Sequence, residues 1–87
     1  MQRADVFDRL TKIFQDVFND KNIILGDATT AKDVKDWDSL ATISLISEIE
    51  YQFSVKFSMK AVQGMKSVGE MVGIILQELD SRTKHNN

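Results

Sequence analysis

The sequence predicts an all-α fold, a small four-helix bundle formed by a single domain. Three segments of the 87-residue chain, near residues 6–18, 40–53 and 68–79, carry apolar side chains at helical spacing. Proline is absent and the four glycines are scattered, so no stretch has the composition of an interdomain linker. A chain this long buries roughly 60–65% of its unfolded surface, which allows one modest core and little room for a deep catalytic cleft.

The first predicted helix has one apolar stripe and is followed by a long connection. The stripe consists of Val6, Phe7, Leu10, Ile13, Phe14, Val17 and Phe18. The segment from Asn19 to Asp38 shows no sustained apolar period, and at about twenty residues it is longer than most loops. Such a loop is either functional or packed by its own side chains, and we expect Val34 and Trp37 to anchor it in the core.

The second strong helix is predicted from Ser39 to Phe53. Its apolar residues cover a broad arc, as in a central helix, and the predicted buried face consists of Leu40, Ile43, Leu45, Ile46, Ile49 and Phe53. At 100° per residue the opposite face holds Ala41, Ser44, Ser47, Glu48 and Tyr51.

Two further helices complete the predicted bundle. Ser58 can cap a short helix that reaches Gln63 and is stopped by Gly64. The segment 67–70, Ser-Val-Gly-Glu, matches a capping box at the start of the last helix. That helix carries apolar residues at Val68, Met71, Val72, Ile75, Leu76 and Leu79, and we interpret Met59, Met65 and Met71 as core residues.

Composition narrows the classes of function. A net charge of −2 argues against a general nucleic-acid binder. The absence of cysteine excludes disulfides, thiolate metal sites and a cysteine nucleophile. The single histidine, His85, lies in a polar tail, which argues against a Ser-His-Asp relay. We expect one domain over residues 1–87, with an ordered core from 4 to 80 and the tail from 81 to 87.

Targeting signals are not expected. The first five residues carry charges where a signal peptide needs an apolar stretch. The longest largely apolar run, residues 71–76, is far shorter than a membrane span. We therefore expect a cytoplasmic protein that does not insert into a membrane.

Three acidic residues, Asp33, Asp36 and Asp38, suggest a calcium-binding loop, which needs oxygen ligands at alternate positions. Such a loop needs a glycine at its sixth position and a glutamate at its twelfth. Counted from Asp36, these positions are Ala41 and Ser47, so the motif fails and no metal site is expected.

The segment from Asp36 to Leu40 places a serine at the first turn of the second helix, directly after the long loop. In one interpretation Asp38 or Ser39 is only the helix N-cap, because both residue types favour that position. In the other, the Ser39 hydroxyl lies near free backbone N–H groups and the positive end of the helix dipole, which suits an attached phosphate. Periodicity does not decide between them, because the direction of this side chain depends on the loop.

Asp38-Ser39-Leu40 resembles the attachment motif of acyl carrier proteins. The resemblance covers most of the chain: an amphipathic first helix, a long loop, this motif at the start of the central helix, a short third helix and a capped last helix. Within the central helix it continues through Leu45-Ile46, Ile49-Glu50 and Phe53. A short motif is evidence for a family only when its structural context matches, and here the order and spacing of the predicted helices match those of the family.

The resemblance implies a function. In the family, a phosphopantetheinyl transferase joins 4′-phosphopantetheine from coenzyme A to the serine that matches Ser39, and Asp38 belongs to the motif that the transferase recognises. The thiol of the arm then carries an acyl or aminoacyl group as a thioester, and the protein itself catalyses nothing. The implied partners are the transferase, a loading enzyme and acyl-transferring enzymes, with the carrier a monomer. The implied acyl cavity involves Ile43, Ile46, Val62 and Met65.

The acidic residues of this chain differ from those of the acyl carrier proteins of fatty-acid synthesis. Those proteins resemble one another in having an acidic central helix, which basic patches on partner enzymes recognise. The candidate partner-recognition residues here are Asp36, Asp38, Leu40, Glu48 and Glu50. Residues 27–50 hold six acids and two lysines, so we expect partner binding to weaken with salt. Positions often acidic in the fatty-acid group hold Ala41, Ser44, Tyr51 and Gln52. Together with Trp37, this pattern favours a specialised or surface-polysaccharide pathway over bulk fatty-acid synthesis.

Two alternatives stay open at this point. An unmodified helical adaptor would use Asp38 and Ser39 only as a cap. A hydrolase built on Ser39 would need a base and an orienting partner, and the sequence offers no pattern for either.

Overall fold

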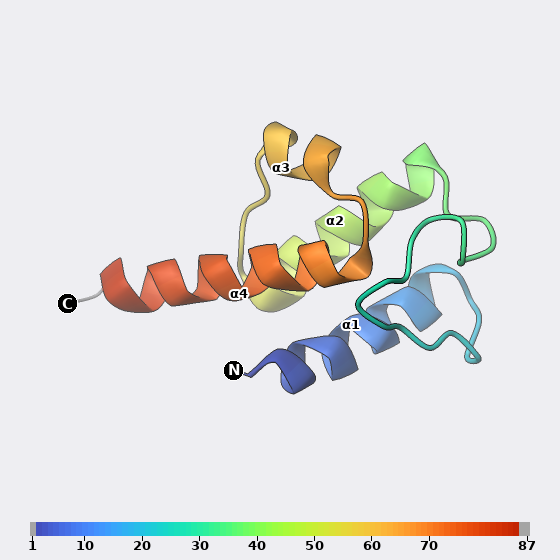
Figure 1. Cartoon of the computed structure of the whole chain (residues 1–87), viewed down its shortest axis with the longest axis horizontal. Helices are drawn as coiled ribbons and strands as arrows, with labels where there is room; N and C mark the ends of the chain where they lie inside the picture. The colour runs from blue at the N-terminus through green and yellow to red at the C-terminus, as the bar shows by residue number, and fades with distance from the viewer. Residues whose placement is uncertain (1, 86–87) are drawn as a thin grey trace.

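The computed structural model describes the backbone of residues 2–85 and the side chains of residues 2–81. Its helices are α1 (Arg3–Val17), α2 (Ser39–Phe53), α3 (Met59–Gly64) and α4 (Val68–His85), and no strand occurs among the described residues. The radius of gyration is 12.6 Å. Figure 1 shows α1 and α4 running in opposite directions, with the long loop at the end of the molecule where α2 begins. The predicted all-α bundle is confirmed.

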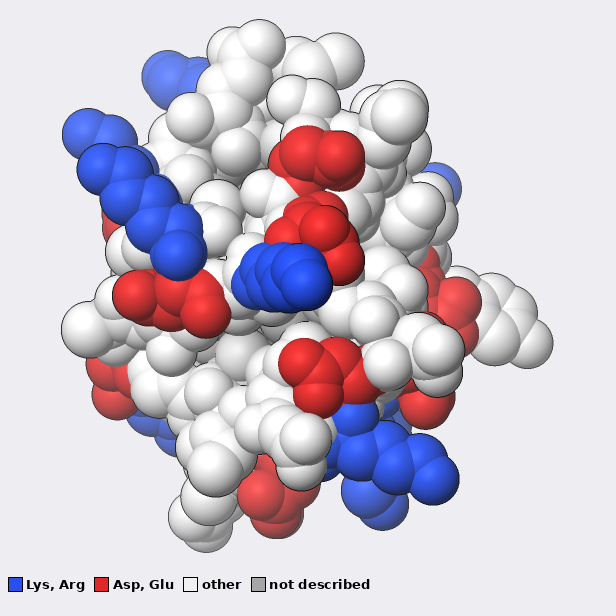
Figure 2. Space-filling view, turned by 90° about the vertical axis from the view of Figure 1, so that its right-hand side faces the viewer, with Lys and Arg blue, Asp and Glu red and all other residues white. Residues whose placement is uncertain are grey.

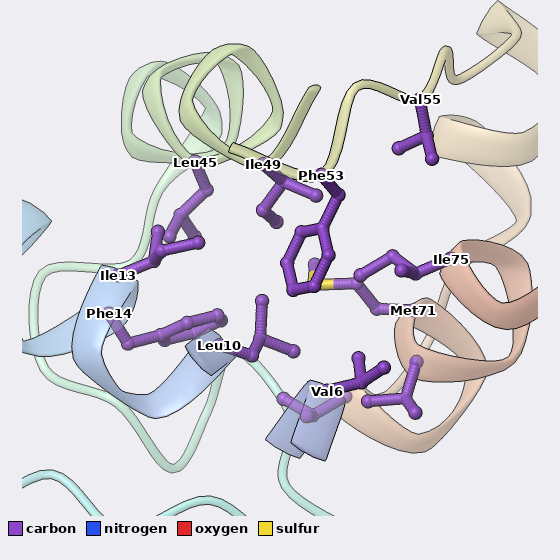
Figure 3. Close-up of a cluster of buried hydrophobic side chains, with 12 residues drawn as sticks. Val6, Leu10, Ile13, Phe14, Leu45, Ile49, Phe53, Val55, Met71 and Ile75 are labelled. Carbon is purple, nitrogen blue, oxygen red and sulfur yellow. The ribbon is translucent and has the colours of Figure 1, made fainter. Parts of the chain in front are cut away.

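The core forms where α1 packs against α2 and α4. Successive turns of α1 bury Val6, Leu10, Ile13 and Phe14, as the apolar stripe predicts. Figure 3 shows these side chains meeting those of α2, α4 and the connector after α2, namely Leu45, Ile49, Phe53, Val55, Met71 and Ile75. Among the described helices, none is long and apolar enough to cross a membrane.

The predicted buried face of α2 is wrong at its first turns. Leu40 is 75% exposed and Ile43 is 63% exposed, whereas Leu45, Ile49 and Phe53 are buried and Ile46 is half-buried. The physical reason is that α2 has apolar residues around much of its circumference, so the period does not identify which of them α1 and α4 cover. Met59, which we interpreted as a core residue, is 74% exposed at the start of α3.

The loop between α1 and α2 is held by its own turns and by α4. The Gly26 N–H donates to the Thr29 hydroxyl over 2.9 Å. The Thr29 carbonyl then accepts from the Val68 N–H at 2.8 Å, and the Asp27 carbonyl accepts from the Gly69 N–H at 3.0 Å. These bonds satisfy two N–H groups that a helix N-terminus leaves free. The loop is thereby tied to the start of α4.

Both predicted anchors of the loop are confirmed. Val34 is 7% exposed, and Trp37 packs against the core with its ring edge-on to Phe14, the centroids being 5.1 Å apart. The ion pair between Arg3 and Asp27 adds a contact between the loop and the start of α1.

The two remaining helix starts have the predicted caps. The Ala61 N–H donates to Ser58 Oγ at 3.0 Å at the start of α3. At α4, the Glu70 N–H donates to Ser67 Oγ at 3.3 Å, as predicted. The Glu70 carboxylate accepts from the Lys66 N–H at 3.0 Å, one residue before the N–H that a capping box uses, so the reciprocal half of the box differs from the prediction. The backbone of α4 stays helical to residue 85, beyond the last apolar position, while residues 86–87 of the predicted polar tail lie outside the described residues.

Replacing Gly69 by alanine tests the loop–α4 contact. A Cβ at this position would lie 2.7 Å from the Asp27 carbonyl oxygen, too close for any real contact. We expect Gly69→Ala to lower the free energy of unfolding by about 1–3 kcal/mol. The matched control is Gly73→Ala in the same helix, where a Cβ meets nothing within 4 Å, and it should raise stability by about 0.5–1 kcal/mol. Urea unfolding measures both, and equal effects of the two changes would contradict the proposed close packing.

Candidate functional site

The start of α2 is capped by Asp38, not by Ser39. Asp38 is extended, at φ −111° and ψ −169°, and its Oδ1 accepts from the Ala41 N–H at 2.8 Å. Ser39 is the first residue of the helix and is exposed. Among the residues that the structure describes, the Ser39 hydroxyl has no hydrogen-bond partner. The cap therefore does not use this hydroxyl, which is exposed to solvent and accessible to a modifying group.

The backbone around Ser39 also presents free donors. The first N–H groups of an α-helix have no acceptor within the helix. In α2 the Ala41 N–H binds the cap and the Thr42 N–H binds the Asp38 carbonyl at 2.9 Å. Within the described part of the chain, the N–H groups of Ser39 and Leu40 have no acceptor. An anion attached to Ser39 would meet these donors and the positive end of the helix dipole.

The side chain of Trp37 fixes the position of this helix start. Its Nε1–H donates to Thr42 Oγ1 at 2.8 Å, and the same hydroxyl donates to the Asp38 carbonyl at 3.0 Å. The indole meanwhile packs on the buried ring of Phe14 and on Phe18. Trp37, Thr42 and Asp38 thus form a short network that connects the core to the turn bearing Ser39.

Sequence reasoning missed Thr42. The sequence contains no signal for the hydrogen bond between Thr42 and Trp37, because Trp37 lies in an irregular loop whose conformation no pattern predicts. A threonine four residues after a cap is compatible with a bond to the cap carbonyl, which is the only part of this network that spacing could have indicated.

A small pocket opens beside this network. It has a volume of about 150 Å³ and lies between the loop, α2, the end of α3 and the start of α4. Its walls are Ala31, Trp37, Thr42, Val62, Met65, Lys66, Ser67 and Met71. Two of the candidate acyl-cavity residues, Val62 and Met65, therefore line the same pocket. The other two, Ile43 and Ile46, line no part of this pocket, because Ile43 points to solvent and Ile46 packs on the core.

The candidate partner-recognition residues divide into two groups. Asp36, Asp38 and Leu40 are exposed close to Ser39. Asp36 adopts a left-handed backbone, φ 70°, which aspartate tolerates. Glu48 and Glu50 are half-buried. Glu48 Oε1 accepts from the Gln52 amide at 2.9 Å, while Glu50 Oε2 accepts from the Phe57 N–H at 2.7 Å. The Glu50 carboxylate therefore holds the connector between α2 and α3.

Acidic and basic side chains are interspersed on the end of the molecule that carries the loop, as Figure 2 shows. The exposed charges of the segment before α2 are Lys32, Asp33, Lys35, Asp36 and Asp38. The predicted acidic surface is thus broken by two lysines.

The described residues contain no group of three or more His, Asp or Glu side chains placed to hold a metal ion. Asp33, one member of the rejected calcium pattern, uses Oδ2 to accept from the Thr30 N–H at 2.9 Å and so closes a turn of the loop. His85 has no described side chain.

The cap can be tested separately from the hydroxyl. Asp38→Ala removes the acceptor of the Ala41 N–H, so we expect the free energy of unfolding to fall by about 1 kcal/mol. Asp38→Asn keeps a capping oxygen and should lose no more than a few tenths of a kcal/mol. Denaturant melts of the two variants beside the wild type measure the difference, and an alanine variant as stable as the asparagine variant would show that the cap contributes little.

Two comparisons with known proteins identify the family of this chain. The family described as "Phosphopantetheine attachment site" matches residues 8–75. A solved structure, the solution NMR structure of holo acyl carrier protein from Geobacter metallireducens, is 35% identical with a TM-score of 0.86, and the match covers 92% of each chain. No curated protein matches the sequence. Because the family match spans most of a chain with this fold, the protein belongs to the acyl carrier protein family, whose members are non-catalytic carriers with a covalently attached phosphopantetheine.

Proposed function

We propose that the phosphopantetheine of this carrier is attached to Ser39 Oγ, and that Asp38 orients the site for the transferase. The observation that carries the proposal is an exposed hydroxyl with no partner among the described residues, at the first residue of α2. Asp38 provides the cap, so an adduct on Ser39 costs the helix none of its hydrogen bonds. In the adaptor alternative both residues serve only as a cap, and Ser39 has no part in the observed one.

The surroundings of Ser39 suit the attached group. The phosphodiester would lie near the free N–H groups of Ser39 and Leu40, which favour an anion. When bound, the arm supplies the thiol that the cysteine-free chain lacks, and on it an acyl or aminoacyl group is carried as a thioester. The polypeptide holds the arm at the end of a rigid helix and presents it at high effective concentration to separate enzymes.

We propose that the pocket beside Trp37 is the binding site for the carried acyl or aminoacyl group. Val62, Met65 and Met71 give it apolar walls, and Thr42 lies one turn along α2 from Ser39. The pocket is small, with a volume of about 150 Å³. This volume supports a short acyl or aminoacyl cargo.

We propose that the carrier serves a specialised or surface-polysaccharide pathway. We also propose that it is located in the cytoplasm. The support is the scarcity of carboxylates on α2, whose two glutamates both have hydrogen-bond partners within the helix or the connector. The partners in this proposal are a phosphopantetheinyl transferase, a loading enzyme and acyl-transferring enzymes, met by a monomeric carrier that binds no nucleic acid.

Ser39→Ala tests the attachment site. We expect no phosphopantetheine adduct after incubation with coenzyme A, magnesium and a broad-specificity transferase, as measured by intact mass. Stability should change by no more than about 0.5 kcal/mol, because the hydroxyl makes no bond in the fold and alanine is a good helix former. The matched control is Ser44→Ala, an exposed serine on the same helix, which should gain one adduct like the wild type. An adduct on Ser39→Ala would disprove the assignment.

Complementation tests the pathway. The chain should support growth poorly when it replaces the acyl carrier protein of a bacterial fatty-acid synthase, because its central helix offers few free carboxylates to basic partner surfaces. The holo form must be verified by mass in the same cells, so that poor growth is not caused by missing modification. Full growth on this chain alone would contradict the specialised pathway.

A further inference from the structure

The short helix α3 takes little part in the core. None of its side chains is buried, and the main helix–helix contacts of the described chain join α1 to α2 and α1 to α4. In Figure 1 α3 lies away from α1, between the end of α2 and the start of α4. The position of α3 therefore depends on the segment that leads into it and on the segment that leads out of it.

Glu50 holds the segment that leads into α3. Its carbonyl accepts from the Ser54 N–H and, at 3.2 Å, from the Val55 N–H, where α2 ends. Its carboxylate reaches further along the connector, since Oε2 accepts from the Phe57 N–H at 2.7 Å. A hydrogen bond to an ionised acceptor is stronger than one between neutral groups. One half-buried residue of α2 thus binds three N–H groups of the connector.

The other glutamate of α2 makes no such link. Glu48 is also half-buried, but its Oε1 accepts from the Gln52 amide at 2.9 Å, within the same helix. Of these two carboxylates, that of Glu50 is the one that connects α2 to the segment before α3.

The connector determines where one wall of the pocket lies. Phe57 directly precedes Ser58, whose hydroxyl caps α3. Val62 follows one turn later, and its N–H donates to the Ser58 carbonyl at 3.0 Å. Val62 and Met65 are walls of the pocket proposed for the carried group. A shift of the connector would therefore move this wall.

A second carboxylate binds the chain at the far end of α3. The Lys66 N–H, directly after Met65, donates to Glu70 Oε2 at 3.0 Å. Glu70 also takes part in the start of α4 through Ser67, so its replacement would alter two features at once. The bond from the Glu50 carboxylate goes to the connector. Glu50 is therefore the residue through which the position of α3 can be tested.

We infer that Glu50 is a positioning residue for the carried group: by holding the Phe57 N–H, it places α3 so that Val62 and Met65 close one side of the pocket. Glu50 does not line the pocket, so it acts through the connector. The inference rests on the proposed function, in which this pocket binds the carried acyl or aminoacyl group.

Amide hydrogen exchange of the unmodified chain gives the first test. Glu50→Ala removes the acceptor of the Phe57 N–H, so we expect exchange at Phe57, Val62 and Met65 to become about tenfold faster. The rates are taken relative to the Leu10 N–H in the core of α1, which reports global unfolding. An increase confined to Phe57, or no increase relative to Leu10, would overturn the inference, because α3 would then not depend on this bond.

Two further variants separate the hydrogen bond from the bulk of the side chain. Glu50→Gln keeps an amide oxygen that can accept from the Phe57 N–H, so exchange at Val62 and Met65 should stay within about threefold of the wild type. Gln52→Ala is the matched control, because it removes the bond to Glu48 without touching the connector, and it should change these rates less than about twofold. A glutamine variant that exchanges as fast as the alanine variant would contradict the role of the hydrogen bond.

The carried group gives the second test. Each chain is loaded at Ser39 from butyryl-coenzyme A by the transferase, and hydrolysis is followed by intact mass without partner enzymes. In this reaction water releases butyrate and leaves the thiol on the arm. A pocket that excludes water slows such hydrolysis. We expect Glu50→Ala to lose the butyryl group at least about three times as fast as the wild type, and Glu50→Gln and Gln52→Ala to match the wild type.

The outcomes distinguish this inference from the proposed function. Equal hydrolysis in the wild type and in Glu50→Ala, with both slower than free butyryl-pantetheine, would overturn the role of Glu50 and leave the pocket as the binding site. Hydrolysis of the loaded wild type at the rate of the free thioester would refute the pocket, and with it the inference. Failure of the wild type to gain any adduct would instead refute the proposed attachment on which both depend.

Discussion

The contact of Trp37 with Phe14 and Thr42 is the interaction on which the rest of the site depends. The indole meets the fully buried ring of Phe14 in α1 in an edge-to-face arrangement, and its N–H donates to the Thr42 hydroxyl, which itself donates to the cap carbonyl of α2. The other apolar side chains of the loop that pack on the core are Val34, Ile23 and Leu25. This side chain therefore connects the core to the start of α2, where Ser39 lies.

The loop is rigid at its other end because it caps α4. Backbone carbonyls of Asp27 and Thr29 accept from the first N–H groups of that helix, and Gly69 allows the approach by having no Cβ. One segment thus satisfies a helix start at one end and positions another helix start at the other. A loop of this length would otherwise carry a large conformational entropy, which these contacts reduce in the folded state.

Asp38 and Ser39 have different roles at the start of α2. Asp38 provides the hydrogen bond that the helix needs, so Ser39 is left with a hydroxyl that the fold does not use. An adduct at Ser39, as proposed, would therefore remove none of the hydrogen bonds of the cap. Leu40 and Ile43 on the next turn are also exposed, so the core does not use them either.

The sequence by itself determined the four helices, their caps at Ser58 and Ser67, the long loop and the serine at the start of the central helix. These are local properties, set by apolar period and by residue types that favour helix ends. Only the tertiary structure decided which apolar residues of α2 are buried, that Thr42 receives the Trp37 N–H, and that Glu50 is held by the connector. A helix with apolar residues on several sides has more than one possible buried face, and the choice depends on where α1, α4 and the folded loop come to lie, which no local pattern encodes.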